Sequence, residues 1–145
     1  MRKATGAEYP PAQSLGWLAE AYGKTGQESK GLRVLEEALA TIHWAGDLLF
    51  EPELHRLRGE LLLMQDPSNW GAGTRCCQVA IEMSARLGAK SLELRAKTSL
   101  ARLLAKRRHC KEARAVLTDI YGWFTEGFDT LDLQDAKSLL NELRG

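Results

Sequence analysis

The sequence has little of what would indicate a disulfide scaffold, a membrane protein or a nucleic-acid binder. Its three cysteines, two of them adjacent, form a poor disulfide framework and suit a reducing compartment. Apolar runs such as Leu48–Phe50 are too short to cross a bilayer, and no apolar segment follows Met1-Arg2-Lys3 as it would in a secretion signal. A net charge of +1 gives no overall field that would attract DNA, RNA or an anionic membrane. We therefore expect a cytoplasmic protein with no membrane partner.

The sequence also lacks the motifs of a catalytic, cofactor or metal site. Cys76-Cys77 with His43 or His55 matches no Cys-x-x-Cys or His-x-x-x-His spacing, and no local signature of a nucleophile and its base occurs. The stretch Gly71-Ala72-Gly73 has neither the Gly-Lys-Ser/Thr ending nor the preceding strand of a phosphate loop, so we expect a simple loop there. We expect no metal, no cofactor and no chemistry of the chain's own, including no binding of ATP.

Helical periodicity is the strongest feature that the sequence does have. Between Ala96 and Phe124, small and large apolar residues share one face of a first helix, and a second apolar stripe follows a basic turn. The two stripes consist of Leu100, Ala101 and Leu104, and then Ala113, Leu117, Ile120 and Phe124. Two such helices can bury their stripes only against each other and against neighbours, so this stretch predicts a helical hairpin.

The pattern of this hairpin recurs along the chain. Ala19 and Gly31 lie twelve residues apart, and Ala101 and Ala113 are separated by the same interval. The hairpins themselves repeat at intervals of 42 and 40 residues, measured at Ala38, Ala80 and Ile120. Small residues at fixed positions allow close packing of paired helices, as in tetratricopeptide (TPR) repeats.

The sequence therefore predicts an all-α fold, more closely a right-handed TPR-like superhelix. We expect a flexible lead over residues 1–11, then hairpins at about 12–45, 48–88 and 90–124, and a capping helix over about 130–143. The fourth helix is predicted to begin near Ala72. The core faces of the third and last helices are expected to be Phe50, Leu54, Leu57, Leu61 and Met64, and Leu133, Ala136, Leu140 and Leu143.

Three stretches resemble one family. They are Leu18–Gln27, then Glu53–Leu63 with Ala89–Ala96, and the tail Tyr121–Thr130 with Asp132-Leu133 and Ala136-Lys137. These stretches resemble the C-terminal TPR region of large bacterial regulators that join an ATPase module to such repeats, often behind a class III adenylate/guanylate cyclase or a DNA-binding domain. The resemblance covers residues 15 to 143 and implies a protein-interaction or intramolecular regulatory module. Leu131 stands where similar proteins usually have Pro, and the cyclase and ATPase motifs are absent from these residues.

The resemblance also implies where a partner would bind. In TPR hairpins the first helix of each pair lines a concave groove, which would carry Glu20 and Lys24, then Glu53, Arg56 and Glu60, then Arg95, Thr98, Arg102 and Lys106. This groove is expected to become more basic toward the C-terminal repeat and to attract acidic side chains or a chain-terminal carboxylate. We expect Arg95 and Arg102 to be free for a partner, so that reversing their charge leaves the fold intact. The alternative, that these are solvated helix faces, stays open.

The sequence leaves two other functions open and also predicts that the chain associates with itself. The chain could be part of a catalytic cyclase or ATPase polypeptide, or the basic run Lys106–Lys111 could belong to a helical-repeat nucleic-acid-binding module. Further repeats would normally stack on the first hairpin, so we expect an uncovered apolar surface there, formed by Trp17, Val34 and Trp44. Such a surface predicts a two-fold homodimer through the first hairpin.

Overall fold

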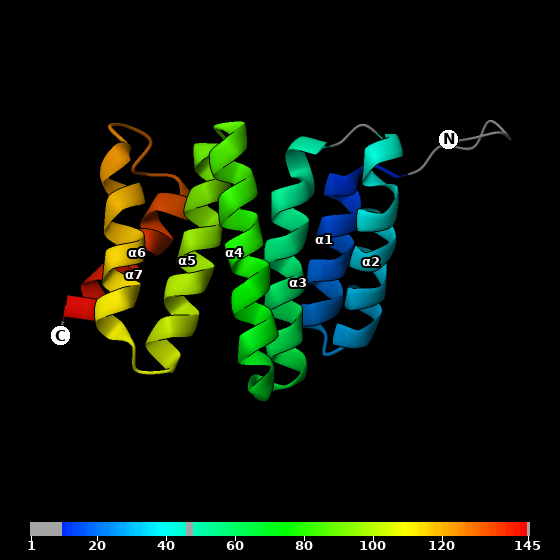
Figure 1. Ribbon diagram of the computed structural model, residues 1–145, viewed down its shortest axis with the longest axis horizontal. Coiled ribbons are helices and arrows are strands. Elements are labelled where there is room, and N and C mark those ends of the chain that lie inside the picture. The colour runs from blue at the N-terminus through cyan, green and yellow to red at the C-terminus, as the bar shows by residue number, and fades with distance from the viewer. Residues whose placement is uncertain (1–9, 46–47, 145) are drawn as a thin grey trace, which may run out of the picture.

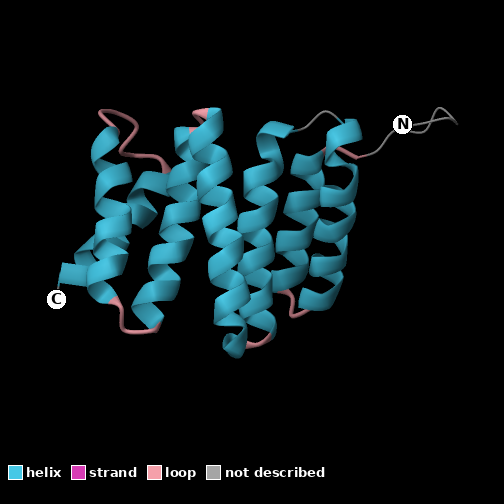
Figure 2. Cartoon of the chain, viewed as in Figure 1, coloured by secondary structure: helices cyan, strands magenta, loops and turns pink. Residues whose placement is uncertain are grey.

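The computed structural model describes residues 10–45 and 48–144, and within these ranges helices are the only regular secondary structure (Figures 1 and 2). The α-helices are α1 (Ala12–Lys24), α2 (Glu28–Ala45), α3 (Glu51–Gln65), α4 (Trp70–Leu87), α5 (Lys90–Lys106), α6 (Cys110–Trp123) and α7 (Leu131–Arg144). Two short 3₁₀ helices, η1 (Leu48–Phe50) and η2 (Pro67–Asn69), precede α3 and α4. The all-α class is confirmed, whereas the predicted lead over residues 1–11 lies outside the described residues except for its last two positions.

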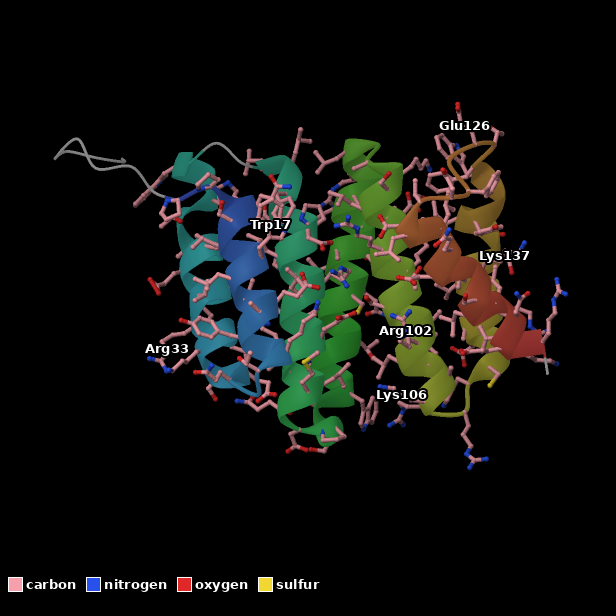
Figure 3. The ribbon with its side chains drawn as sticks, turned by 180° about the vertical axis from the view of Figure 1, so that it is seen from behind. Trp17, Arg33, Arg102, Lys106, Glu126 and Lys137 are labelled. Carbon is pink, nitrogen blue, oxygen red and sulfur yellow. The ribbon has the colours of Figure 1, made fainter. Side chains whose placement is uncertain are left out.

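The helices pack in two layers. Consecutive helices form the pairs α1 with α2, α3 with α4, and α5 with α6, while α1, α3, α5 and α7 also contact one another in turn. These four odd-numbered helices make up the layer seen from behind in Figure 3, which we call the odd-helix face. In the described ranges, no helix combines the length and the apolar character needed to span a bilayer.

Small residues set the distance between paired helices. A Cβ atom added to Gly31 in α2 would lie 2.8 Å from the carbonyl oxygen of Ala19 in α1, and one added to Gly59 in α3 would lie 3.0 Å from the carbonyl oxygen of Gly73 in α4. The two residues of the first pair are twelve positions apart in sequence, and those of the second pair are fourteen positions apart. The second hairpin needs the longer separation because η2 is inserted into its turn. Close backbone approach therefore explains glycine in helix interiors, where it is otherwise unfavourable.

The core divides into two buried clusters, one at each end of the stack. The first joins α1, α2 and α3 through residues such as Leu35, Ile42 and Leu54, and the second joins α5, α6 and α7 through residues such as Leu117 and Leu133. Most of the predicted stripe residues are buried in these clusters, including Ala113, Leu117 and Ile120.

Three details differ from the sequence prediction. In α7, Leu139 is buried and Leu140 is only half-buried, because α7 meets α5 and α6 together and the face it buries is turned by one residue. Met64, the last but one residue of α3, is 52% exposed and belongs to neither buried cluster. Residues 71–73 are not a loop, because α4 begins at Trp70 directly after η2, whose first turn is capped by a hydrogen bond from the Ser68 backbone to Asp66 Oδ1 (3.0 Å).

Gly31→Ala should destabilise the protein, and Gly71→Ala should not. The added methyl group at position 31 meets a backbone oxygen that cannot move without separating α1 from α2, so we expect a loss of about 1–3 kcal/mol in the free energy of unfolding. At Gly71, in the first turn of α4, no atom lies within 4 Å of the new methyl group, so helix propensity should raise stability by up to about 1 kcal/mol. Urea unfolding measures both values. Equal effects of the two substitutions would contradict the close contact.

Candidate functional site

The odd-helix face carries two hollows. The acidic hollow has a volume of about 380 Å³ and is lined by Gln13, Trp17, Glu20, Phe50, Glu53, Arg56, Leu57, Arg95, Thr98, Leu131, Asp132 and Asp135. The basic hollow has a volume of about 440 Å³ and is lined by Glu60, Leu63, Met64, Pro67, Trp70, Ser99, Arg102, Leu103, Lys106 and Arg107. The acidic hollow holds four carboxylates against two guanidinium groups, and the basic hollow holds three cations against one carboxylate.

A buried carboxylate, Glu53 of α3, organises the acidic hollow. Its two oxygens accept hydrogen bonds from Arg56 Nε (2.9 Å) and Nη2 (2.6 Å), which form a bidentate pair. Arg95 of α5 donates from Nη1 to Glu53 Oε2 (3.2 Å) and from Nε to Asp132 Oδ2 of α7 (2.9 Å). This network therefore joins α3, α5 and α7 through charged groups that already have partners.

The same network extends toward the basic hollow. Arg56 Nη1 donates to Glu60 Oε2 (3.0 Å) and to Ser99 Oγ (3.2 Å), and the Ser99 hydroxyl donates to Glu60 Oε2 (2.6 Å). Thr98, beside Ser99 in α5, turns its hydroxyl to the Leu94 carbonyl oxygen of its own helix (2.8 Å). In the part of the chain that the structure describes, every buried side-chain nitrogen or oxygen has a partner. The centre of the odd-helix face is thus closed to a ligand that would need these groups.

The electrostatics of the two arginines follow from this pairing. Burial is the largest single effect and by itself would lower the pKa of Arg56, but its hydrogen bonds to Glu53 and the negative charges of three nearby glutamates raise it above its ordinary value. The pKa of Arg95 is also raised, because the hydrogen bond to Asp132 and the charges of Glu53 and Asp132 outweigh burial. Both guanidinium groups therefore stay charged at every pH at which the protein is folded.

The structure distributes the predicted groove residues over both hollows. Those that line the acidic hollow are Glu20, Glu53, Arg56, Arg95 and Thr98. Those that line the basic hollow are Glu60, Arg102 and Lys106, and Lys24 lines neither. The expected gradient of charge is therefore revised. Positive charge increases along α5 toward its C-terminal end, and the side of the face nearest α7 is acidic because α7 contributes Asp132 and Asp135.

The structure also corrects the expectation that Arg95 is free for a partner. It is held between Glu53 and Asp132, so it links helices and is not free for a partner. Reversing its charge would place a third carboxylate beside these two and damage the fold. Arg102 and Lys106 fit the original expectation better, because both are exposed and form no ion pair or hydrogen bond in the described residues.

Sequence reasoning missed the aromatic and apolar parts of the basic hollow. Trp70 is 44% exposed, and the guanidinium of Arg107 stacks on its ring at 3.5 Å from the centroid. Met64 lies beside them and is exposed as well. Trp70 opens a helix and Arg107 ends the hairpin turn after α5, so no helical spacing connects them. Only the packing of the second and third hairpins brings them together.

Trp17 also lies elsewhere than expected. It is 60% exposed, but it lines the acidic hollow together with residues of α3, α5 and α7. Figure 3 shows it on the odd-helix face, so it is not part of an outer surface of the first hairpin. Of the three residues expected at that open end, Val34 is half-buried and packs on the first core cluster, which leaves Trp44 as the exposed aromatic residue. The dimer through the first hairpin stays a prediction.

The thiols and histidines do not form a reactive centre in the described residues. No group of three or more His, Cys, Asp or Glu side chains there is placed to hold a metal ion. Cys77 is buried against α3, and burial, with the charge of Glu60 as a smaller cause, raises the pKa of its thiol to about 12. His109 pairs with Glu112 on the surface of α6 at 3.0 Å.

No family model and no curated protein matches the chain.

Glu53→Gln should destabilise the protein strongly. The substitution removes the buried carboxylate that Arg56 and Arg95 share and leaves each with one carboxylate partner, Glu60 or Asp132, so we expect the free energy of unfolding to fall by about 3 kcal/mol. Glu36→Gln in α2 is the matched control, because Glu36 is exposed, lies outside both hollows and has no ion-pair partner in the described residues. The control should change stability by less than about 0.5 kcal/mol in the same urea titration. A similar effect of both variants would show that the network does not hold the helices together.

The three cysteines should differ in reactivity. In the folded protein at mildly alkaline pH, Ellman's reagent should modify Cys110, which is exposed, and should not modify Cys76 or Cys77, which are buried. The raised pKa keeps the Cys77 thiol protonated, and the thiolate is the reactive form. All three should react after denaturation in guanidinium chloride. Rapid modification of three thiols in the folded state would mean that α3 and α4 open readily.

Proposed function

We propose that the chain is a protein-interaction or intramolecular regulatory module of a bacterial signalling protein, of the adenylate cyclase or ATPase-type regulators that its sequence resembles. It acts in the cytoplasm, binds a partner protein or another domain of its parent protein on the odd-helix face, and carries out no chemistry of its own. The observation that carries the proposal is the basic hollow, where cations without ion-pair partners surround exposed aromatic and apolar side chains.

The repeat geometry supports the TPR-like superhelix that this proposal includes. The turns of the first and third hairpins have the same hydrogen bond, from Gln27 N to Tyr22 O and from His109 N to Leu104 O, each at 2.8 Å. Both turns place one residue in the left-handed region, Gly26 at φ 78° and Arg108 at φ 65°. Arg108 adopts it at a steric cost that Gly26 avoids. The same bond, from Ala89 N to Ser84 O, and a left-handed residue, Gly88, also end α4, so this is a common helix ending, and the repeat is supported instead by the close contacts of small residues in the first two hairpins.

The composition of the basic hollow supports binding of a protein segment. Trp, Met and Arg are the side chains enriched in protein interfaces, and Trp and Arg dominate the residues that contribute most to affinity. Trp70, Met64 and Arg107 present this combination on one surface. Arg102 and Lys106 add two cations with no carboxylate partner in the described residues, so an acidic partner is favoured electrostatically.

The basic run Lys106–Lys111 supports a protein partner more than a nucleic acid. Its members do not form one continuous strip: Lys106 and Arg107 line the hollow, Arg108 occupies the turn, and His109 pairs with Glu112. The opposite charge of the neighbouring acidic hollow would also repel a phosphate backbone that passed along the face.

Site-specific photo-crosslinking tests the proposal. Benzoylphenylalanine at Met64, inside the basic hollow, should crosslink a discrete partner or parent domain in cells, and the product should disappear when Arg102→Glu and Lys106→Glu are added. Benzoylphenylalanine at Val79, an exposed residue of α4 outside both hollows, is the control and should give no product. Equal products at the two positions, or none at Met64, would contradict a binding function of this face.

A further inference from the structure

Charge is segregated along the C-terminal part of the sequence. Residues 102–114 contain six Lys or Arg and one acidic residue, whereas residues 115–136 contain five Asp or Glu and no Lys, Arg or His. Adjacent blocks of opposite charge attract each other wherever the fold lets them meet. The basic block includes the cations of the basic hollow, and the acidic block includes the loop between α6 and α7.

The fold keeps the cations of the basic hollow and the carboxylates of the α6–α7 loop apart within one chain. The basic hollow lies at the C-terminal end of α5, and the α6–α7 loop begins at the C-terminal end of α6. The 14 residues of α6 separate the two, which corresponds to about 21 Å at 1.5 Å per residue. Figure 3 shows both in the C-terminal half of the molecule, with Lys106 toward the bottom of the view and Glu126 at the top. The charges can therefore meet only between two chains.

The loop between α6 and α7 exposes aromatic rings and carboxylates. We define the acidic loop as residues 123–129, in which Trp123 is 57% exposed and Phe128 is 45% exposed. Glu126 and Asp129 are exposed beside these rings and form no ion pair in the described residues. The loop is held in place, because Gly127 takes a positive φ of 78° and its carbonyl oxygen accepts hydrogen bonds from the Thr130 backbone (2.9 Å) and hydroxyl (2.7 Å). Little conformational entropy is lost when such a loop docks.

We propose that the basic hollow binds the acidic loop of a second copy of this chain. The aromatic rings of the loop would contact the exposed faces of Trp70 and Met64, and the two carboxylates would pair with Arg102 and Lys106. A two-fold axis would bring the loop of each copy to the hollow of the other. Each copy then contributes one loop and one hollow, and the dimer is closed. This interface differs from the first hairpin, and the inference does not depend on the proposed function.

The dimer would also limit access of a partner to the basic hollow. The basic hollow is the surface that we propose for the partner, so a second copy would compete with the partner for it. Binding of the partner and formation of the dimer should therefore oppose each other.

Charge exchange between the two surfaces tests the proposal on the full chain. We would measure the dissociation constant of the dimer by sedimentation velocity over a micromolar dilution series, at low and at high salt. Arg102→Glu with Lys106→Glu, and separately Glu126→Lys with Asp129→Lys, should each weaken the dimer at least about tenfold. The combined fourfold variant restores opposite charges and should recover the dissociation constant of the original protein to within about threefold. High salt should weaken the dimer of the original protein and of the fourfold variant, in which opposite charges face each other, and should not weaken it further in the two reversed variants, in which like charges do.

Two controls accompany these variants. Lys30→Glu with Arg33→Glu makes the same change of net charge on α2, outside both surfaces, and should leave the dimer unchanged. Thermal melting by circular dichroism checks that each variant folds. If a charge-reversed variant does not fold, glutamine takes the place of the reversed residue at the same positions.

Several results would overturn the proposal. They are a chain that stays monomeric at the highest concentration in low salt, a dimer that survives either charge reversal, and a fourfold variant that folds but stays monomeric. A dimer that is lost with Trp44→Glu and kept with the Arg102 and Lys106 reversal would place the interface on the first hairpin instead.

Discussion

The close approach of paired helices at small residues is the constraint on which the rest of this structure depends. Gly31 against the carbonyl oxygen of Ala19, and Gly59 against that of Gly73, leave no room for a methyl group. Helices packed at this distance bury narrow apolar stripes completely, so each hairpin becomes a thin unit that can stack on the next. Stacking in turn places α1, α3, α5 and α7 side by side, which creates the face that carries both hollows.

The Glu53 network determines which part of that face is available. Burying charged groups is costly unless they are paired, and here the pairing crosses from α3 to α5 and on to α7. Arg95 of the acidic hollow is therefore used to position α7, the helix without a partner in a hairpin. The cations beyond the reach of this network, at the end of α5, are the ones left for a ligand.

Much of the fold could be predicted from local pattern, because helical periodicity and small residues at fixed intervals depend on neighbours a few positions apart. The twelve-residue spacing from Ala19 to Gly31 and the buried stripe around Leu117 are examples. The site could be predicted only in part. Helical spacing places Arg102 on a free helix face, but the pairing of Arg95 with Asp132 depends on how α7 docks, 37 residues along the chain. The contact of Trp70 with Arg107 depends equally on packing between hairpins.

Charge segregation connects the site to regulation. If the basic hollow binds the acidic loop of a second copy, the hollow is open in an isolated chain and occupied in a chain held beside other copies. In a parent protein that brings two copies together, the effective concentration of the loop at the hollow greatly exceeds the bulk concentration. A partner must then compete with that loop, and its apparent affinity falls by the ratio of this effective concentration to the dissociation constant of the dimer. Contacts of modest strength between Arg102, Lys106 and the loop carboxylates would therefore be sufficient to control binding of the proposed partner.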